Sequence, residues 1–479
     1  MGSSSSLEFI GFALIVVVVY QLIRSALWRQ LVLLTASCWF LSTFSHDYRA
    51  YIPFILFLSF GYLGLYMIKR APTRAFLLVV TATVVLFVWL KKYSFVPAAT
   101  FLPFPYLTVG LSYILFRILH LMIDSHDGLL KKPISPFQYL VYVINFTTLV
   151  SGPIQKYPEF RSMVEATGSV RPGLPTIGVA VERIVRGLFK AHVLASISSD
   201  LQASALAQLS RGVDAPGHLL PGVLAFACYP LFLYCNFSGY IDIVIGIASL
   251  LGITLPENFN RPFFSDSFIG FWNRWHITLS EWLKTYIFNP LLMALMRKYP
   301  ARRMEPFWAV LAFFVTFFLV GVWHGTTAAF LFFGFLQGFT VSANKLYQIL
   351  MTKWLGRKAY QSVSSNPYYV AVARGLTFTW FTFTLLWFWS NWNQIVSLFL
   401  ALGFKDLAEV WLAILIGSTL ILAVWEALRV AFLSIQWQGS PFLYSRYWRT
   451  AWNTALLMIV LALGLLWNKP PPEMVYKAF

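Results

Sequence analysis

The sequence has few charged residues and almost no cysteine. Only 11% of its 479 residues are Asp, Glu, Lys or Arg, whereas a soluble globular domain carries roughly a quarter. So small a charged share leaves too little polar surface to cover a body in water, and lipid must replace water over much of it. The three cysteines, Cys38, Cys228 and Cys235, lie in apolar runs without C-x-x-C spacing. This pattern argues against a disulfide framework and against a zinc site.

The chain also lacks a hydrophilic block long enough to be a soluble domain. It is 58% hydrophobic, and its 36 basic against 18 acidic residues give a net charge of +18. Basic cytoplasmic loops and contact with anionic lipid explain this excess, so it does not indicate nucleic acid. We expect one all-α polytopic membrane domain over residues 1–479, with N-terminal helices over 1–104, a motif-bearing core over 105–348 and C-terminal helices over 349–479.

Apolar segments recur along the whole chain, and each crossing of a membrane needs about 20 mostly apolar residues. The first segment lacks a basic leader and a cleavage site, which predicts a retained span rather than a signal peptide. Several segments are short enough to be re-entrant or interfacial, so we expect about 10 to 13 crossings. The candidate segments are 8–23, 30–45, 52–68, 74–90, 105–123, 137–150, 177–200, 219–235, 237–252, 307–323, 327–348, 368–390, 408–428 and 452–467.

Basic residues between these segments predict the orientation. Arg24 and Arg29 separate the first two segments, and Lys353 and Arg357 fall in a later loop without an acidic residue. Loops rich in Lys and Arg stay in the cytoplasm, so we place these two loops there. Between residues 124 and 306 the half-length segments leave either direction of crossing open.

The longest polar-rich stretch, residues 252–306, is the first candidate for chemistry. From residue 268 onward Phe271, Trp275, Leu279 and Trp282 recur at three- and four-residue spacing. The spacing predicts an amphipathic helix that lies in the membrane interface or lines a cavity. His276 lies on a neighbouring face of that helix. Taken alone, it is interpreted as a histidine that extends toward the polar interface.

A second histidine, His324, lies in Trp323-His324-Gly325 directly after the segment 307–323. At 1.5 Å per residue that segment rises about 24 Å from its basic end. The histidine should therefore lie deep, toward the outer side of the membrane. An ionisable group at that depth indicates function, unless it is a neutral histidine that joins two helices. Asp242 is a further buried candidate, unless it holds helices together with Ser238.

These stretches resemble the membrane-bound O-acyltransferase (MBOAT) family, in the bacterial branch that contains alginate O-acetylation and D-alanyl transfer proteins. The resemblance runs from about residue 105 to 340. The stretches that carry it are Cys235-Asn236-Phe237-Ser238-Gly239-Tyr240-Ile241-Asp242, Pro256-Glu257-Asn258-Phe259-Asn260-Arg261-Pro262, Phe271-Trp272-Asn273-Arg274-Trp275-His276-Ile277-Thr278-Leu279-Ser280 and Trp323-His324-Gly325.

The resemblance implies helices around a funnel or tunnel in a bacterial cytoplasmic (inner) membrane, with His324 as the catalytic histidine and His276 as a second functional one. It implies acyl transfer, with acetyl as the expected group, from a cytoplasmic thioester of coenzyme A or of a carrier-protein phosphopantetheine. The acceptor would be an exported polysaccharide or a partner acyltransferase outside. No bound cofactor or metal is expected. Residues expected to bind substrate are Asn258, Arg274, Trp275, Trp323, Ser238 and Asp242, with Asn258 or Arg274 as candidate oxyanion donors.

Two departures limit what can be inherited from the family. Asn236 stands where family members usually carry an acid, and 289–293 reads Asn-Pro-Leu-Leu-Met where alginate-type members have Pro-Leu-Gly-Gly-Asn. Transfer of D-alanine from a carrier protein therefore stays open beside acetyl transfer. A proton-coupled transporter or flippase is the alternative from another class, although no symmetric pair of interrupted helices supports it.

Overall fold

The computed structural model describes residues 7–68, 72–130, 132–166, 171–210, 217–301, 303–437, 440–467 and 472–473. Most of these residues are helical, and the strands among them are the two-residue β1 (Gln436–Trp437) and β2 (Ser440–Pro441). The chain divides into two compact units. The first unit comprises 1–191, 237–256 and 473–479, and the second comprises 192–236 and 257–472. Whether the two act as the single membrane domain expected from the sequence stays a prediction.

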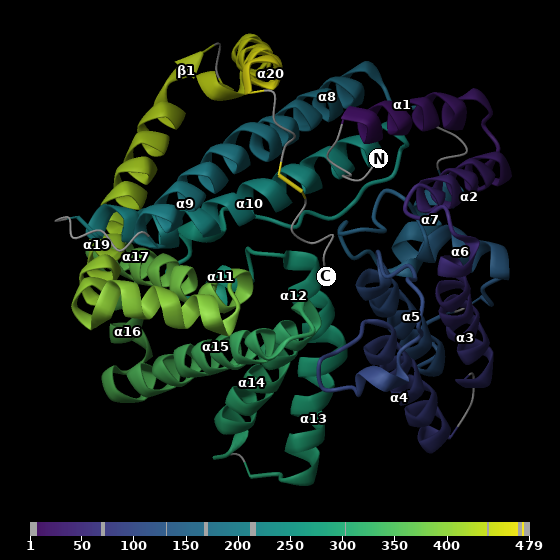
Figure 1. Cartoon of the computed structure of the whole chain (residues 1–479), viewed down its shortest axis with the longest axis horizontal. Helices are drawn as coiled ribbons and strands as arrows, with labels where there is room; N and C mark the ends of the chain where they lie inside the picture. The colour runs from purple at the N-terminus through teal and green to yellow at the C-terminus, as the bar shows by residue number, and fades with distance from the viewer. Residues whose placement is uncertain are drawn as a thin grey trace. The chain divides into compact units, whose positions relative to one another are not determined.

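The first unit contains the N-terminal helices, of which α3, α4 and α5 lie side by side (Figure 1). Its helices are α1 (Leu7–Leu22), α2 (Ala26–Ser42), η1 (Tyr48–Tyr51), α3 (Ile52–Ile68), α4 (Thr73–Leu90), η2 (Ala98–Thr100), α5 (Leu111–His126), α6 (Pro136–Val143), α7 (Tyr157–Ala166), α8 (Leu174–Leu188) and the second part of α10 (Leu219–Leu250). The π-helical turn η3 (Phe189–Leu194) follows α8 directly.

A buried arginine supports the short helix α6. Arg117 of α5 is 3% exposed and donates hydrogen bonds to the carbonyl oxygens of Tyr142, Val143 and Thr148 at 2.6–3.1 Å. The last carbonyl groups of a helix have no partner within the helix. The guanidinium supplies those partners at the end of α6, and it thereby allows the chain to continue as the irregular buried segment 144–156.

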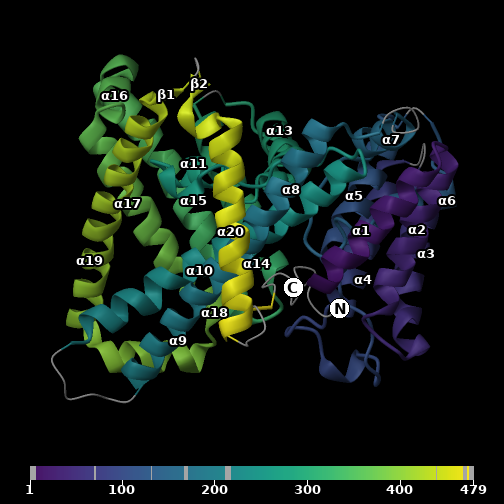
Figure 2. The ribbon, with the colours of Figure 1, turned by 90° about the horizontal axis from the view of Figure 1, so that it is seen from above.

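The second unit contains the two long helix pairs α14–α15 and α17–α19, which Figures 1 and 2 show running alongside each other. Its helices are α9 (Ala195–Ser210), the first part of α10, η4 (Pro262–Phe264), α11 (Phe268–Trp272), α12 (Ile277–Leu283), η5 (Lys284–Phe288), α13 (Asn289–Lys298), α14 (Glu305–His324), α15 (Ala328–Leu355), α16 (Arg357–Ser364), α17 (Pro367–Thr384), α18 (Leu386–Trp389), α19 (Trp392–Ser434), η6 (Phe442–Tyr444) and α20 (Arg446–Trp467). In Figure 2, α16 and α18 lie at opposite ends of this unit.

Glycines set the close crossing of α14 and α15. A Cβ atom on Gly321 would overlap the backbone of Gly334, and one on Gly338 would lie 2.6 Å from the carbonyl oxygen of Phe314. Helices packed in lipid gain stability from such close approach of their backbones, because lipid gives little hydrophobic drive for association. The pair therefore forms a closely packed hairpin that carries His324 at its turn.

Within the described residues seven helices are long and apolar enough to cross a membrane, and α1 is a shorter apolar helix. The all-α polytopic class is thus confirmed. Seven is fewer than the 10 to 13 crossings expected, and two observations account for part of the difference. The segments 219–235 and 237–252 form one helix, α10, because Asn236 does not interrupt it. The segments 105–123 and 137–150 contain helices of only 16 and 8 residues.

Candidate active site

The chain around His276 is folded back on itself rather than continuously helical. Helix α11 ends at Trp272, and His276 adopts a left-handed conformation (φ 47°, ψ 52°) before α12 begins. The amphipathic helix predicted from residue 268 onward is therefore wrong. Phe271, Trp275 and Leu279 are all buried as the spacing implied, but they come from two short helices and the turn between them.

A facing segment holds this turn in place. The amide of Asn260 donates to the carbonyl oxygen of Arg274 at 2.9 Å, and the amide of Ile277 donates to the carbonyl oxygen of Asn258 at 3.0 Å. These bonds pair the strand-like residues 258–260 with residues 274–277. A non-glycine residue with positive φ is strained and needs such support from its surroundings. The pairing supplies it, and it brings Asn258 beside His276.

The side chain of Asn258 fixes which nitrogen of His276 carries the proton. Its Oδ1 lies 3.1 Å from the amide nitrogen of Thr278, 2.9 Å from the Thr278 hydroxyl and 3.2 Å from Nδ1 of His276. A backbone amide can only donate, so the atom facing it must be the oxygen of the Asn258 amide. An oxygen acceptor in turn requires a donor at Nδ1 of His276. In the neutral ring the proton is therefore on Nδ1, and Nε2 carries the lone pair.

His276 is 0% exposed and lies outside the seven candidate spans. Burial lowers the pKa of His276 to about 3, because a charged imidazolium would lose its hydration there. The ring is therefore neutral at ordinary pH. A neutral imidazole with one fixed acceptor nitrogen can take part in proton transfer or receive a hydrogen bond.

His324 lies in the same unit, at the last residue of α14, and is 2% exposed. Its ring centroid lies 5.2 Å from that of Phe388 and 6.1 Å from that of Phe333. Trp323 connects the two histidines, since its ring lies 4.7 Å from His324 and meets His276 edge-on at 6.1 Å. The two imidazoles are close enough to interact electrostatically. The structure thus brings the two predicted histidines, Trp323 and Asn258 into one buried cluster.

The packing of Phe330 explains why a glycine, Gly325, follows His324. A Cβ atom at this position would overlap the ring of Phe330. The chain leaves α14 in an extended conformation here (φ −165°, ψ 167°) and enters α15 three residues later. The missing side chain therefore lets Phe330 close over the turn beside the histidine.

A family model described as "MBOAT, membrane-bound O-acyltransferase family" matches residues 119–386, which include all four residues of this cluster. The chain belongs to the membrane-bound O-acyltransferase family. Similar curated proteins include a "Teichoic acid D-alanyltransferase" of Bacillus subtilis (strain 168), 27% identical over 271 residues, and one of Streptococcus thermophilus, 30% identical over 241 residues. A "Probable alginate O-acetylase AlgI" of Azotobacter vinelandii is 28% identical over 243 residues. These matches cover 56%, 49% and 51% of this chain and 65%, 56% and 45% of the three relatives.

Trp275 and Arg274, both expected to bind substrate, make packing and backbone contacts. Trp275 is 2% exposed and packs on Phe271 and Phe381 with ring centroids 5.5 and 5.3 Å away, which favours a packing role. Arg274 is half-buried, and its carbonyl group holds the pairing with Asn260. Their roles in binding stay predictions.

Ser238 and Asp242 belong to the first unit, on α10, and both are buried. The carboxylate of Asp242 accepts from Nε of Arg183 at 3.0 Å and from Nζ of Lys190 at 2.7 Å. These partners lie on α8 and on η3, which cross α10 closely. A Cβ on Gly187 would lie 2.6 Å from the carbonyl oxygen of Gly239. The ion pairs join the two helices at this crossing, which favours the structural reading of Asp242.

Thr278 and Phe388 were missed by the sequence reasoning. The backbone amide of Thr278 shows which side-chain atom of Asn258 is the oxygen. The only feature of the sequence that could have pointed to Thr278 is its position two residues after His276. Phe388 lies 64 positions beyond His324, in α18, and the sequence around it gives no sign of the contact with the histidine. Among the described residues no group of three or more His, Cys, Asp or Glu side chains is arranged to hold a metal ion.

Proposed function

We propose that this protein transfers an acyl group from a cytoplasmic thioester to a hydroxyl group on the far side of a bacterial cytoplasmic membrane. The observation that carries the proposal is the buried cluster of His276, Trp323 and His324 within the region matched by the family model. A buried pair of imidazoles is suited to move a proton between an attacking hydroxyl and a leaving thiolate.

In the proposed reaction His324 takes the proton of the acceptor hydroxyl while its oxygen attacks the thioester carbonyl carbon. A C–O bond forms, and the tetrahedral intermediate then expels the thiolate as the C–S bond breaks. The His324 imidazolium returns its proton to that thiolate, so the donor leaves as a free thiol. His276 positions the hydroxyl, because Asn258 keeps Nε2 of this ring as a hydrogen-bond acceptor.

The donor and the acceptor are proposed from the relatives and from charge. We expect acetyl transfer from coenzyme A or from a carrier-protein phosphopantetheine, to an exported polysaccharide or to a partner acyltransferase outside. Transfer of D-alanine from a carrier is the alternative, because the similar proteins include D-alanyltransferases as well as an alginate O-acetylase. A basic cytoplasmic face suits either donor, since both carry phosphate.

The test uses the full chain in liposomes, with a radiolabelled donor on one side and a hydroxyl acceptor only on the other. Labelled acetyl-coenzyme A and a labelled D-alanyl carrier protein are supplied in separate experiments. Ester-linked label on the acceptor supports the proposal, and the donor that delivers it identifies the branch. Label that crosses the membrane without forming an ester would support the transporter alternative. No ester from either donor would contradict the proposal.

A further inference from the structure

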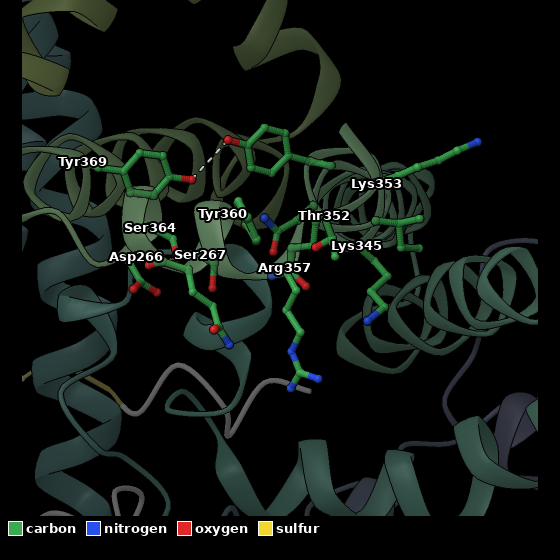
Figure 3. A pocket seen from close by; sticks show the side chains of 14 residues that line it. Asp266, Ser267, Lys345, Thr352, Lys353, Arg357, Tyr360, Ser364 and Tyr369 are labelled. Atoms are coloured by element: carbon green, nitrogen blue, oxygen red, sulfur yellow. Dashed lines mark hydrogen bonds between the residues drawn. The ribbon is translucent and has the colours of Figure 1, made fainter. Parts of the chain in front are cut away.

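A basic pocket lies at the end of the second unit where α15 meets α16. It has a volume of about 790 Å³, and its charged lining residues are Lys345, Lys353, Arg357 and Asp266. Figure 3 shows Lys345 and Arg357 extending toward the same side of the pocket, with Lys353 directed away from them. Three cations against one carboxylate give this pocket a net positive charge, so it suits an anionic group.

An apolar groove of about 810 Å³ adjoins this pocket, between α15 and α17. Phe339 and Ala343 line it from α15, and Val372, Leu376 and Trp380 line it from α17. The two hollows share Asp266, Ser267, Asn344, Tyr347 and Tyr369 as common lining residues, so they are continuous. A ligand that occupies both must be charged at one end and apolar at the other.

The dimensions of the groove match one leaflet of a bilayer. From Tyr369 to Trp380 the helix α17 rises about 16 Å at 1.5 Å per residue. Half of a hydrocarbon core that is about 30 Å thick is about 15 Å. Tyr347 and Tyr369, whose hydroxyl oxygens lie 3.2 Å apart, mark the boundary between groove and pocket. Tyrosine is enriched at the level of the lipid headgroups.

We infer that the basic pocket and the apolar groove together bind one anionic phospholipid of the cytoplasmic leaflet. The phosphate lies beside Lys345 and Arg357, and an acyl chain lies along Phe339, Leu376 and Trp380. Basic pockets between membrane helices on the cytoplasmic side are suited to acidic headgroups. A soluble phosphate compound satisfies the cations equally well but leaves the groove unfilled, and for this reason a lipid is favoured. The inference does not depend on the proposed acyl transfer.

The test is native mass spectrometry of the delipidated full chain, titrated with phosphatidylglycerol and with phosphatidylcholine that carries the same acyl chains. Phosphatidylglycerol is expected to bind more tightly. Each cation near a phosphate contributes about fivefold, so Lys345→Gln with Arg357→Gln is expected to weaken its binding about 25-fold. The matched control removes two exposed cations of α13, Arg297→Gln with Lys298→Gln, and is expected to leave binding unchanged.

A second variant tests the groove without changing charge. Ala343→Phe places a ring in the groove and is expected to weaken phosphatidylglycerol binding, whereas Ala431→Phe at an exposed position of α19 is not. Equal affinity of the unmodified protein for the two lipids would overturn the inference. Displacement of phosphatidylglycerol by millimolar glycerol phosphate or coenzyme A would also overturn it, because the site would then recognise phosphate without an acyl chain.

Discussion

Replacing Asn258 by leucine tests the assignment of the His276 tautomer and the support of the turn together. Leucine has a similar shape but no oxygen. The Thr278 hydroxyl would lose its acceptor, and so would two N–H groups, the amide of Thr278 and Nδ1–H of His276, in a site that is 0% exposed at residues 258 and 276. A buried donor without a partner costs about 1–3 kcal/mol, so the two together cost about 2–6 kcal/mol. That loss is comparable with the whole stability of many folded domains, which is about 5–15 kcal/mol.

The assay is thermal unfolding of the purified protein in detergent, together with ¹⁵N NMR of histidine-labelled protein. Asn258→Leu is expected to unfold at a clearly lower temperature. Asn258→Asp keeps an oxygen at the same place, so it is expected to retain the Nδ1–H form of His276. The matched control is Asn393→Leu at an exposed amide of α19, where a surface substitution changes stability by no more than about 0.5 kcal/mol.

Two results would refute this reasoning. A His276 signal with the proton on Nε2 in the unmodified protein would mean that the amide of Asn258 is oriented the other way. An unchanged unfolding temperature in Asn258→Leu, equal to that of Asn393→Leu, would mean that the oxygen does not support the turn.

Three further predictions concern the pH response of stability and the helix crossings within each unit. The low pKa of His276, about 3, means that the unfolded chain binds a proton below about pH 6.5 that the folded chain excludes. Between about pH 6.5 and about pH 3 the free energy of unfolding should therefore fall by about 1.4 kcal/mol for each unit by which the pH is lowered. This dependence should be shallower in His276→Gln, as pH-dependent melting would show. Gly321→Ala should lower stability by about 1–3 kcal/mol, whereas Gly417→Ala, with no atom within 4 Å of the added methyl, should not; equal melting temperatures would contradict the close helix crossing. Asp242→Asn should lower stability by about 2 kcal/mol, since it removes the carboxylate that binds Arg183 and Lys190. This loss lies below the range for fully buried ion pairs. Full stability with lost activity would instead support a role of Asp242 in substrate binding.

The long helices were predictable because they depend on apolar length alone. The segments 307–323 and 327–348 correspond to α14 (305–324) and α15 (328–355), since a run of apolar residues in lipid must satisfy its own backbone. Span length and flanking charge also predict that His324 lies deep in the membrane and is functional, and the structure shows it buried within the protein; its depth and its role stay predictions. The glycine contacts that bring α14 and α15 together depend on the partner helix, so they were not visible in either segment.

The surroundings of His276 could not be predicted from local spacing. The helical spacing of Phe271, Trp275 and Leu279 reflects their shared burial. Two short helices, α11 and α12, bury these side chains as one continuous helix would, so the spacing cannot tell the two cases apart. The interruption at His276 comes from pairing with Asn258, 18 positions earlier in the chain, and no local pattern reports such a contact. The resemblance to the family singled out both Asn258 and His276. The tautomer of His276 could be assigned only from the distances around Oδ1 of Asn258.

The most direct test of the proposed chemistry is ester formation by His324→Ala in liposomes with the labelled donor that the unmodified protein uses. The matched control is His46→Ala at an exposed loop position, and both variants are compared at equal amounts of folded, inserted protein. We predict that His324→Ala forms no ester while His46→Ala matches the unmodified protein. Full ester formation by His324→Ala would contradict the assignment of the catalytic base.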